Sequence, residues 1–388
     1  MHSHSHLNTA KSIIQLYDGS IPLTSWLKQF FKRNKKFGSN DRKQISHACY
    51  CFYRLGNGFK NLDIEERFLT ALFLCSDVSN KILEELKPEW NQIISLPLFE
   101  KIKRLSAEVE ITKIFPFETE ISNEVDINQF NLSFLIQPDL FLRIRPGKRN
   151  KIVEQLQNAT ISFAQLDNDC IQLSNQSKID EILNIDEDVI IQDYNSQKTI
   201  DLFLNSKLQT SNSKLSAWDC CAASGGKSIL LLDYFPDTIL TVSDIRETIM
   251  INLQKRFKRA GIKNYNSFVA DVSSTGFSIQ GKFDLVICDA PCSGSGTWSR
   301  TPEQLVFFKK EKIEYYSTLQ KEIVTNASKG VVKGGFFLYI TCSVFKKENE
   351  EVVDFIEKSF PLQLKSMQYL KGYDKKADTL FVALFLAL

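Results

Sequence analysis

Several features that mark other classes of protein are missing from the 388-residue sequence. The cysteines number nine, an odd count, and no two of them form a C-x-x-C pair. This argues against a disulfide framework and against a zinc knuckle. All four histidines lie within the first 47 residues. A histidine-based catalytic triad in the C-terminal half is therefore excluded, and the cysteines remain as reduced core thiols or as nucleophiles.

Long apolar runs and a strong charge of one sign are also missing. No apolar run reaches the length of a transmembrane helix, and the N-terminal Met-His-Ser-His-Ser-His contains no apolar secretion core. We therefore expect a cytoplasmic protein that has no membrane partner. The formal net charge is only +2, so that any binding of a polyanion must depend on local clusters of basic residues.

The pattern of apolar residues divides the chain into three predicted domains. Apolar residues at helical spacing predict a helical bundle over 1–115. An alternating segment over 134–145 and short strands after it predict a small α/β unit at 130–205. From Leu215 onward strands alternate with helices, which predicts a mostly parallel sheet with helices on both faces in a third domain, 206–388. The weakly periodic stretch between the first two domains is expected to be a linker.

Basic residues gather in two places. The first cluster lies in the helical part and contains Lys28, Lys32, Arg33, Lys35, Lys36, Arg42 and Lys43. It is either a solvated helix face or a surface that contacts RNA phosphates. The second cluster follows the alternating segment and contains Arg143, Arg145, Lys148, Arg149 and Lys151. A basic strand end of this kind could guide an RNA strand.

A turn of small residues follows the strand predicted near Leu215, and ends in Ser-Gly-Gly-Lys227. Gly225 and Gly226 permit positive φ and close approach of a ligand, while the next helix begins with unpaired N–H groups. Taken alone, a plain strand-to-helix turn is equally compatible, since neither G-x-G-x-x-G nor a P-loop is present. Asp244 ends the next apolar run, at the distance where a carboxylate meets ribose hydroxyls. The pair predicts a nucleoside cofactor.

Two cysteines follow predicted strands further along the chain. Cys292 lies in Asp289-Ala-Pro-Cys-Ser-Gly, after the fourth strand, and Cys342 lies in Thr-Cys-Ser, after the fifth. Ligand sites in parallel sheets lie beyond the carboxyl ends of the strands. Adjacent strands are about 5 Å apart, so the two thiols would face one substrate if these strands are neighbours. Asp219 and Asp271 are predicted at the same edge.

These motifs, in this order, resemble the RNA cytosine-5 methyltransferases of the Sun/Fmu (RsmB) and Nop/Sun group. Residues 11–60 look like the NusB-like RNA-binding domain of the bacterial enzymes, and the segments 137–146 and 191–197 resemble their connecting subdomain. The resemblance implies an all-α NusB-like N-terminal domain and a small α/β subdomain. These would precede an α/β Rossmann-like methyltransferase domain with a mostly parallel seven-stranded sheet.

The resemblance also implies the site. S-adenosylmethionine would be bound by Cys221, Ala222, Ala223, Ser224, Gly225, Gly226, Lys227, Asp244, Asp271 and Asp289. Asp244 would take the ribose hydroxyls, and Asp271 would lie near the adenine. Cys342 would be the nucleophile and Cys292 would assist release of the product. Ser224 stands where related enzymes usually carry proline, so that other contacts must hold this turn.

The chemistry of cytosine explains why methylation at carbon 5 requires these residue types. Carbon 5 is a poor nucleophile, and addition of a thiolate at carbon 6 makes the ring able to attack the sulfonium methyl. Asp289 would hydrogen-bond the polar edge of the base. Lys227 would orient that carboxylate or lower the pKa of the thiol. No metal is expected, and the remaining cysteines of the domain, Cys220, Cys221 and Cys288, are expected to pack in its core.

Three functions remain open. The leading interpretation is methylation of RNA cytosine, with 16S ribosomal RNA favoured by the bacterial resemblance and transfer RNA as another substrate. A second is a DNA cytosine-5 methyltransferase that uses Cys292. A third is a non-catalytic RNA-binding ribosome-assembly factor. The segment Arg300–Glu303 is either a loop beside the pocket that touches RNA or a surface turn fixed by Pro302. We expect a monomer.

Overall fold

The computed structural model describes residues 2–206 and 214–388; Met1 and residues 207–213, near the start of the predicted domain 206–388, lie outside this description. The chain forms two compact units. The helical unit consists of Met1–Ile121, Asp126–Gln137 and Thr297–Lys310, and the sheet unit consists of Ser122–Val125, Pro138–Gly296 and Glu311–Leu388. A segment near residue 300 is thus part of the helical unit although its neighbours in sequence belong to the other.

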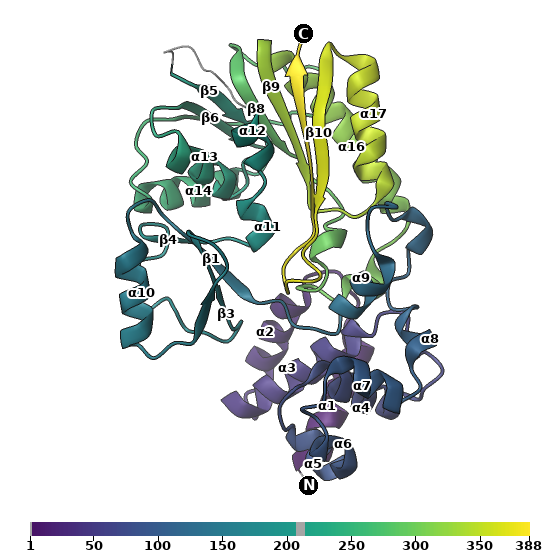
Figure 1. The fold of residues 1–388 in the computed structure, drawn as a ribbon. Coiled ribbons are helices and arrows are strands. Elements are labelled where there is room, and N and C mark those ends of the chain that lie inside the picture. Colours follow the sequence, from purple (N-terminus) through teal and green to yellow (C-terminus); the bar gives the residue numbers. More distant parts are fainter. Residues whose placement is uncertain (1, 207–213) are drawn as a thin grey trace. The chain divides into compact units, whose positions relative to one another are not determined.

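The described elements of the helical unit are all helices, as the apolar spacing predicted (Figure 1). They are α1 (His2–Leu16), α2 (Leu23–Arg33), α3 (Ser39–Arg54), α4 (Ile64–Cys75), α5 (Lys81–Leu86), α6 (Pro88–Gln92), α7 (Leu98–Arg104), α8 (Glu108–Ile111), η1 (Glu118–Glu120), α9 (Ile127–Ser133) and α15 (Gln304–Phe307). Side chains cap several of them: Asp63 accepts the backbone N–H groups of Glu65 and Glu66 at the start of α4.

Most of the stretch over 115–131, which was expected to be a linker, belongs to the helical unit instead, and only Ser122–Val125 is grouped with the sheet unit. Phe115 stacks on Phe134 with ring centroids 5.9 Å apart, and both rings are buried. The buried Arg54 guanidinium donates to the carbonyl of Phe134 at 2.7 Å and to the side chain of Gln137 at 2.5 Å. Tertiary contacts between distant aromatic residues, which local periodicity does not reveal, fold this stretch.

The segment Arg300–Glu303 also differs from its predicted surface position. Glu303 is buried, and its Oε1 accepts the backbone N–H of Leu23 at 3.0 Å. Trp298 is buried as well, with its ring centroid 5.6 Å from that of Phe115. Both residues therefore stabilise the helical unit, and the surface-turn interpretation of this segment is wrong.

The sheet unit begins with a small antiparallel sheet in the order β2-β3-β1-β4. Its elements are β1 (Leu140–Ile144), α10 (Arg149–Asn158), β2 (Phe163–Gln165), β3 (Cys170–Leu173), β4 (Val189–Ile191), α11 (Tyr194–Gln197) and α12 (Asp201–Asn205). The strand predicted over 134–145 is confirmed only in its second half, because the residues before Gln137 belong to the helical unit.

A seven-stranded sheet follows in the order β10-β11-β9-β8-β5-β6-β7, with β5 to β9 parallel and β11 antiparallel to both its neighbours. The strands are β5 (Ser216–Asp219), β6 (Ile239–Asp244), β7 (Asn266–Val269), β8 (Phe283–Asp289), β9 (Val331–Thr341), β10 (Leu362–Leu370) and β11 (Leu380–Ala387). The mostly parallel Rossmann-like sheet is confirmed.

Helices cover both faces of this sheet (Figure 1). They are α13 (Gly226–Tyr234), α14 (Glu247–Arg259), α16 (Glu311–Ala327) and α17 (Glu350–Ser359), and the short helices η2 (Ser295–Thr297), η3 (Ser328–Gly330) and η4 (Lys346–Glu348) join the strands. Successive side chains of β8 enter different cores. Leu285 packs with residues of α13 and α14, whereas Val286 packs with residues of α16 and α17.

Two elements of the sheet differ from expectation. The sequence predicts the fifth parallel strand over Phe336–Ile340 and the helix before it over about 313–331, whereas β9 begins at Val331 and α16 ends at Ala327. The strand β10 was not predicted at all. Across 2–206 and 214–388, no helix is long and apolar enough to cross a membrane.

Candidate active site at the carboxyl ends of the parallel strands

The loop between β5 and α13 takes a tight path that its small residues allow. Ala223 has φ +46° and Gly225 has φ +81°, a region that glycine adopts without penalty. A Cβ on Gly225 would lie 2.5 Å from Cε1 of Phe257, so that only glycine fits between the loop and α14. The N–H of Ala223 donates to Oδ2 of Asp244 at 3.0 Å. The loop is thereby tied to the end of β6.

Ser224 is held by a side chain from α14. Nη1 of Arg256 lies 3.1 Å from Oγ of Ser224 and 3.4 Å from its carbonyl oxygen. Nε of the same guanidinium donates to Asp186, before β4, at 2.6 Å. Arg256 therefore links the small sheet to the β5–α13 loop. Its bonds to Ser224 are contacts of the kind that a serine in place of proline was expected to require.

The Asp244 carboxylate ends β6 and is nearly buried, with 5% of its side chain exposed. Arg246 donates to both carboxylate oxygens, at 2.9 and 3.0 Å. Burial alone would raise the pKa of Asp244, but the hydrogen bonds from Arg246 and from the N–H of Ala223 lower it overall. The group is therefore a carboxylate at neutral pH. Asp271 is exposed after β7, where it accepts from the N–H and Oγ of Ser273.

The two thiols that the sequence placed after neighbouring strands do meet. The strands β8 and β9 pair in parallel, with Asp289 opposite Ile340. The Sγ atoms of Cys292 and Cys342 lie 3.2 Å apart. Burial and the neighbouring sulfur raise the pKa of Cys292 well above its usual range, so this residue remains a thiol at neutral pH. Both cysteines are partly exposed.

Gly296 fixes the loop that carries Cys292 against the loop that carries Cys342. Its N–H donates to the carbonyl of Cys342 at 2.9 Å, and its own carbonyl accepts the N–H of Thr379 at 2.9 Å. A Cβ at this position would lie 1.9 Å from the carbonyl oxygen of Thr379. Gly296 thus has a steric role, because a larger residue at this position would collide with the backbone of Thr379.

A lysine and an aspartate form an ion pair at the same edge of the sheet. Nζ of Lys227, in the first turn of α13, lies 2.6 Å from Oδ2 of Asp289 at the end of β8. Burial disfavours the charge of Lys227, yet the nearby Asp289, Asp219 and Cys342 raise its pKa overall. The ammonium therefore stays charged and holds the Asp289 carboxylate.

Asp219, the last residue of β5, is buried at the carboxyl end of the sheet. Burial raises its pKa to about 7, its Oδ2 accepts the hydroxyl of Ser228 at 2.6 Å, and its Oδ1 has no hydrogen-bond partner among the residues that the structure describes. Cys220 and Cys288 are buried in the sheet core, and Cys221 packs against it, in agreement with the predicted packing role. Among the residues that the structure describes, no group of three His, Cys, Asp or Glu side chains is placed to hold a metal ion.

One cluster near the thiols was not predicted. Glu348, at the end of η4, is fully buried and hydrogen-bonded to serines from both cysteine-bearing loops. In the sequence it lies in the polar run Lys346–Glu351, which is typical of an exposed helix start. Only the tertiary structure identifies it.

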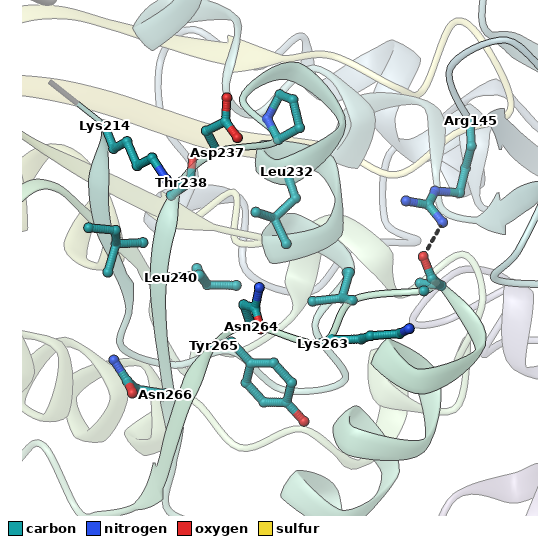
Figure 2. A pocket seen from close by; sticks show the side chains of 15 residues that line it. Arg145, Lys214, Leu232, Asp237, Thr238, Leu240, Lys263, Asn264, Tyr265 and Asn266 are labelled. Atoms are coloured by element: carbon teal, nitrogen blue, oxygen red, sulfur yellow. Dashed lines mark hydrogen bonds between the residues drawn. The ribbon is translucent and has the colours of Figure 1, made fainter. Parts of the chain in front are cut away.

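A hollow of about 700 Å³ lies at the opposite edge of the sheet (Figure 2). Its lining includes Ile239 and Asn266, at the amino ends of β6 and β7, and Lys263. Arg145 reaches its rim, where the guanidinium donates to the carbonyl of Ala260 at 2.6 Å (Figure 2). This hollow contains none of the predicted site residues.

Comparison with protein families supplies a match for the sheet unit. Residues 205–380 match the family described as 16S rRNA methyltransferase RsmB/F. A protein from Xanthomonas campestris named ribosomal RNA small subunit methyltransferase B is 29% identical over 43% of this chain and 42% of its own length. A Coxiella burnetii protein named probable ribosomal RNA small subunit methyltransferase B is 30% identical over 64% of this chain and 62% of its own length. The chain therefore matches less than two thirds of each relative.

Solved structures share the fold. The structure titled PH0851 superposes with a TM-score of 0.68 and 20% identity, and the match covers 92% of this chain and 93% of that one. NSun6 from Pyrococcus horikoshii, solved with SFG, gives a TM-score of 0.57 at 13% identity, over 67% of this chain and 94% of that one. At these identities the likeness concerns the fold.

Proposed function

We propose that the protein transfers a methyl group from S-adenosylmethionine to carbon 5 of a cytosine in RNA, and the match of residues 205–380 to the family described as 16S rRNA methyltransferase RsmB/F supports this proposal. The observation that carries the proposal is the 3.2 Å separation of the Cys292 and Cys342 sulfur atoms at the ends of neighbouring strands. Relatives named as cytosine-5 methyltransferases of 28S rRNA in Mus musculus and of tRNA in Danio rerio are compatible with the same chemistry.

The residues of the β5–α13 loop fit a nucleoside cofactor. In this proposal Cys221 to Lys227 line the cofactor, Asp244 accepts the ribose hydroxyls, and Asp271 lies near the adenine. The carboxylate of Asp244 is already negatively charged and held in place by two donors, Arg246 and Ala223. Such preorganisation lowers the cost of binding polar hydroxyl groups. The cofactor supplies the electrophile, a methyl group on a positively charged sulfur.

Cys342 is the proposed nucleophile. Its sulfur adds to carbon 6 of cytosine, and carbon 5 then attacks the methyl group. Cys292 is less suited to that first step, because burial and the neighbouring sulfur raise its pKa. Once carbon 5 carries the methyl group, a water molecule takes up the carbon 5 proton, the double bond between carbons 5 and 6 forms again, and the bond between carbon 6 and sulfur breaks to leave Cys342 as a thiolate. Cys292 promotes this release from its position 3.2 Å away.

Asp289 and Lys227 act on the base. Asp289 hydrogen-bonds the polar edge of cytosine and favours protonation of the ring nitrogen as the sulfur adds. Lys227 orients this carboxylate through the 2.6 Å ion pair. Because Lys227 also interacts electrostatically with Cys342, the ammonium favours the thiolate at the moment of attack.

The substrate proposed is ribosomal RNA of the small subunit, the 16S molecule in bacteria. The helical unit would serve as the NusB-like RNA-binding domain, with the cluster around Lys32 and Lys36 as a phosphate-contacting surface. Residues 1–115, 130–205 and 206–388 remain the proposed domains. A cytoplasmic location is proposed, because two free thiols whose sulfur atoms lie 3.2 Å apart need a reducing compartment. The protein is also proposed to be a monomer.

Mapping of 5-methylcytosine tests the function. Total RNA from strains with and without the gene is treated with bisulfite and sequenced, and the deletion is complemented with wild-type protein or with Cys342→Ala. We expect one or a few cytosines that lose protection in the deletion and regain it only with the wild type. DNA is assayed in parallel, and methylation of DNA alone would identify the second candidate. Methylation of neither nucleic acid would favour the non-catalytic assembly factor.

A further inference from the structure

A buried carboxylate connects the two loops that carry the thiols. Glu348 has no exposed surface. Its Oε2 accepts the backbone N–H of Ser293 at 2.8 Å, and its Oε1 accepts the hydroxyl of Ser343 at 3.0 Å. Ser293 follows Cys292, and Ser343 follows Cys342. Each oxygen of one carboxylate therefore holds the residue next to one of the two thiols.

Further contacts brace this arrangement. Nε2 of Gln320, from α16, donates to Oε2 of Glu348 at 3.1 Å and to the carbonyl of Pro291, the residue before Cys292, at 3.0 Å. The hydroxyl groups of Ser293 and Ser343 are 3.2 Å apart. The hydroxyl of Tyr339 donates to the backbone carbonyl of Glu348 at 2.7 Å. The residues on both sides of Cys292 are thus fixed, Ser293 by Glu348 and Pro291 by Gln320, and these two side chains are hydrogen-bonded to each other.

The cost of this arrangement argues for a function. Burial raises the pKa of Glu348, although the donors around it oppose the shift. Burying a carboxylate carries a desolvation cost, which an apolar side chain of similar volume would avoid. What an apolar side chain cannot do is hold two loops through directional bonds at fixed separation.

We propose that Glu348 is a positioning residue that sets the separation of the Cys292 and Cys342 sulfur atoms, so that Cys292 can promote release of the adduct formed at Cys342. The inference rests on the proposed function for its catalytic part. Its geometric part concerns the two thiols alone. Glu348 touches neither cofactor nor base in this proposal, and acts through Ser293 and Ser343.

A thiol probe tests the geometry without any RNA. Diamide takes up two hydrogens while two thiols lose them and join in a disulfide, which mass spectrometry detects as a cross-linked Cys292–Cys342 peptide. Full-length Glu348→Gln keeps the size of the side chain but has one acceptor oxygen instead of two. We expect cross-linking to slow at least about tenfold, since a displacement of about 1 Å suffices for such losses between reacting groups. Glu351→Gln, an exposed neighbour, should react like the wild type.

A second readout separates positioning from mere support of the fold. With total ribosomal RNA from the deletion strain and S-adenosylmethionine, turnover by Glu348→Gln should fall by about 10- to 100-fold. At the same time an RNA-linked protein band should accumulate on denaturing gels, because formation of the adduct survives and its release does not. A purely structural role would lower turnover and the adduct together, in proportion to the folded fraction measured by circular dichroism.

Each outcome decides the matter. The proposal would be overturned if Glu348→Gln showed the same cross-linking rate and the same turnover as Glu351→Gln. It would also be overturned if Glu348→Gln lost turnover while its cross-linking rate stayed unchanged and no RNA-linked adduct accumulated. If the wild type methylates no RNA while Glu348→Gln still slows cross-linking, the proposed function fails and the geometric part stands. If Glu348→Gln does not fold, Ser343→Ala takes its place. It keeps the bond between Glu348 and Ser293 but removes the Ser343 hydroxyl, with its bonds to Glu348, Ser293, Ser295 and the N–H of Phe345, and should show the same two effects.

Discussion

Cys292 and Cys342 are 50 residues apart in the chain, and their sulfur atoms lie 3.2 Å apart in the structure. The pairing follows from the parallel register of β8 and β9, which ends both strands at the same edge of the sheet. Two thiols at this distance compete for a single role unless their chemistry differs. The raised pKa of Cys292 supplies the difference that the proposed division of labour requires.

Replacing each thiol should give opposite results. Cys342→Ala should abolish methyl transfer, because the bond to carbon 6 cannot form. Cys292→Ala should leave protein covalently attached to RNA, because release of the adduct is impaired. Denaturing gels with radiolabelled RNA measure both. Cys170→Ala serves as a control, since this cysteine lies in the small sheet. An RNA-linked band with Cys342→Ala instead would reverse the two assignments.

Lys227 and Asp289 should act as one unit rather than as two independent groups. Lys227→Met leaves a partly buried carboxylate without its cation, and Asp289→Asn leaves the ammonium without its anion. Each should lower turnover at least about 100-fold, since catalytic electrostatic partners typically supply about 2.7–4 kcal/mol. The double variant should be little worse than either single one. Losses that simply multiply would show that the two residues act independently. The exposed Lys333→Met provides the control.

Arg256 should support cofactor affinity only while position 224 is a serine. Arg256→Ala removes the contacts of 3.1 and 3.4 Å to Ser224, and we expect weaker binding of S-adenosylmethionine by about three- to tenfold in calorimetry. Ser224→Pro fixes φ by its ring, so Arg256→Ala should have little effect in that background. The neighbouring exposed Lys255→Ala should change nothing in either background. Equal losses in both backgrounds would contradict the interpretation.

Asp219 should make stability depend on pH in a direction opposite to that of most carboxylates. Its pKa is about 7 in the folded protein against 3.8 as the ordinary value, so the unfolded chain loses this proton first. The free energy of unfolding should therefore decline as pH rises from about 4 to 7, by at most about 1.4 kcal/mol per pH unit, and stay level above. Urea titrations of wild type and Asp219→Asn should diverge over this window. Asp237→Asn, which is exposed, should remain parallel to the wild type.

The basic cluster of the helical unit should contribute to RNA affinity through phosphates. Lys32, Lys35 and Lys36 are exposed, and exchange of all three for glutamine should weaken binding without regard to sequence. The slope of log affinity against log salt should fall by about 0.7 for each lost contact to single-stranded RNA. Filter binding at several salt concentrations measures it. Exchange of Lys103, exposed elsewhere on the unit, is the control. An unchanged slope would indicate a solvated face.

Strands with a strong apolar pattern could be predicted from the sequence, and so could the position of the site at their carboxyl ends. The runs at Phe283–Asp289 and Phe336–Ile340 identify buried parallel strands, and the position of Cys292 and Cys342 just after them indicates one shared edge. The edge strand β10 escaped prediction. It pairs on one side only and remains half exposed, and the alternation that begins at Leu362 is broken by a shift of register between Leu364 and Ser366.

Residues whose burial depends on distant partners could not be predicted. Glu348 lies among lysines and glutamates in the sequence, and only its hydrogen bonds to the serines of two other loops explain why it is buried. Glu303 is similar, because its partner is the backbone of Leu23, 280 residues away. In both cases local periodicity indicates solvent, and the tertiary contacts decide otherwise.

The course of the segment Thr297–Lys310 limits how the protein can be divided. It leaves the sheet unit just after the cysteine loop and packs inside the helical unit, where Trp298 meets Phe115 and Phe307 meets Tyr17. A truncated enzyme that starts at Pro138 would expose these rings to water and tend to aggregate. Any exchange of the helical unit for another domain must therefore include the segment Thr297–Lys310.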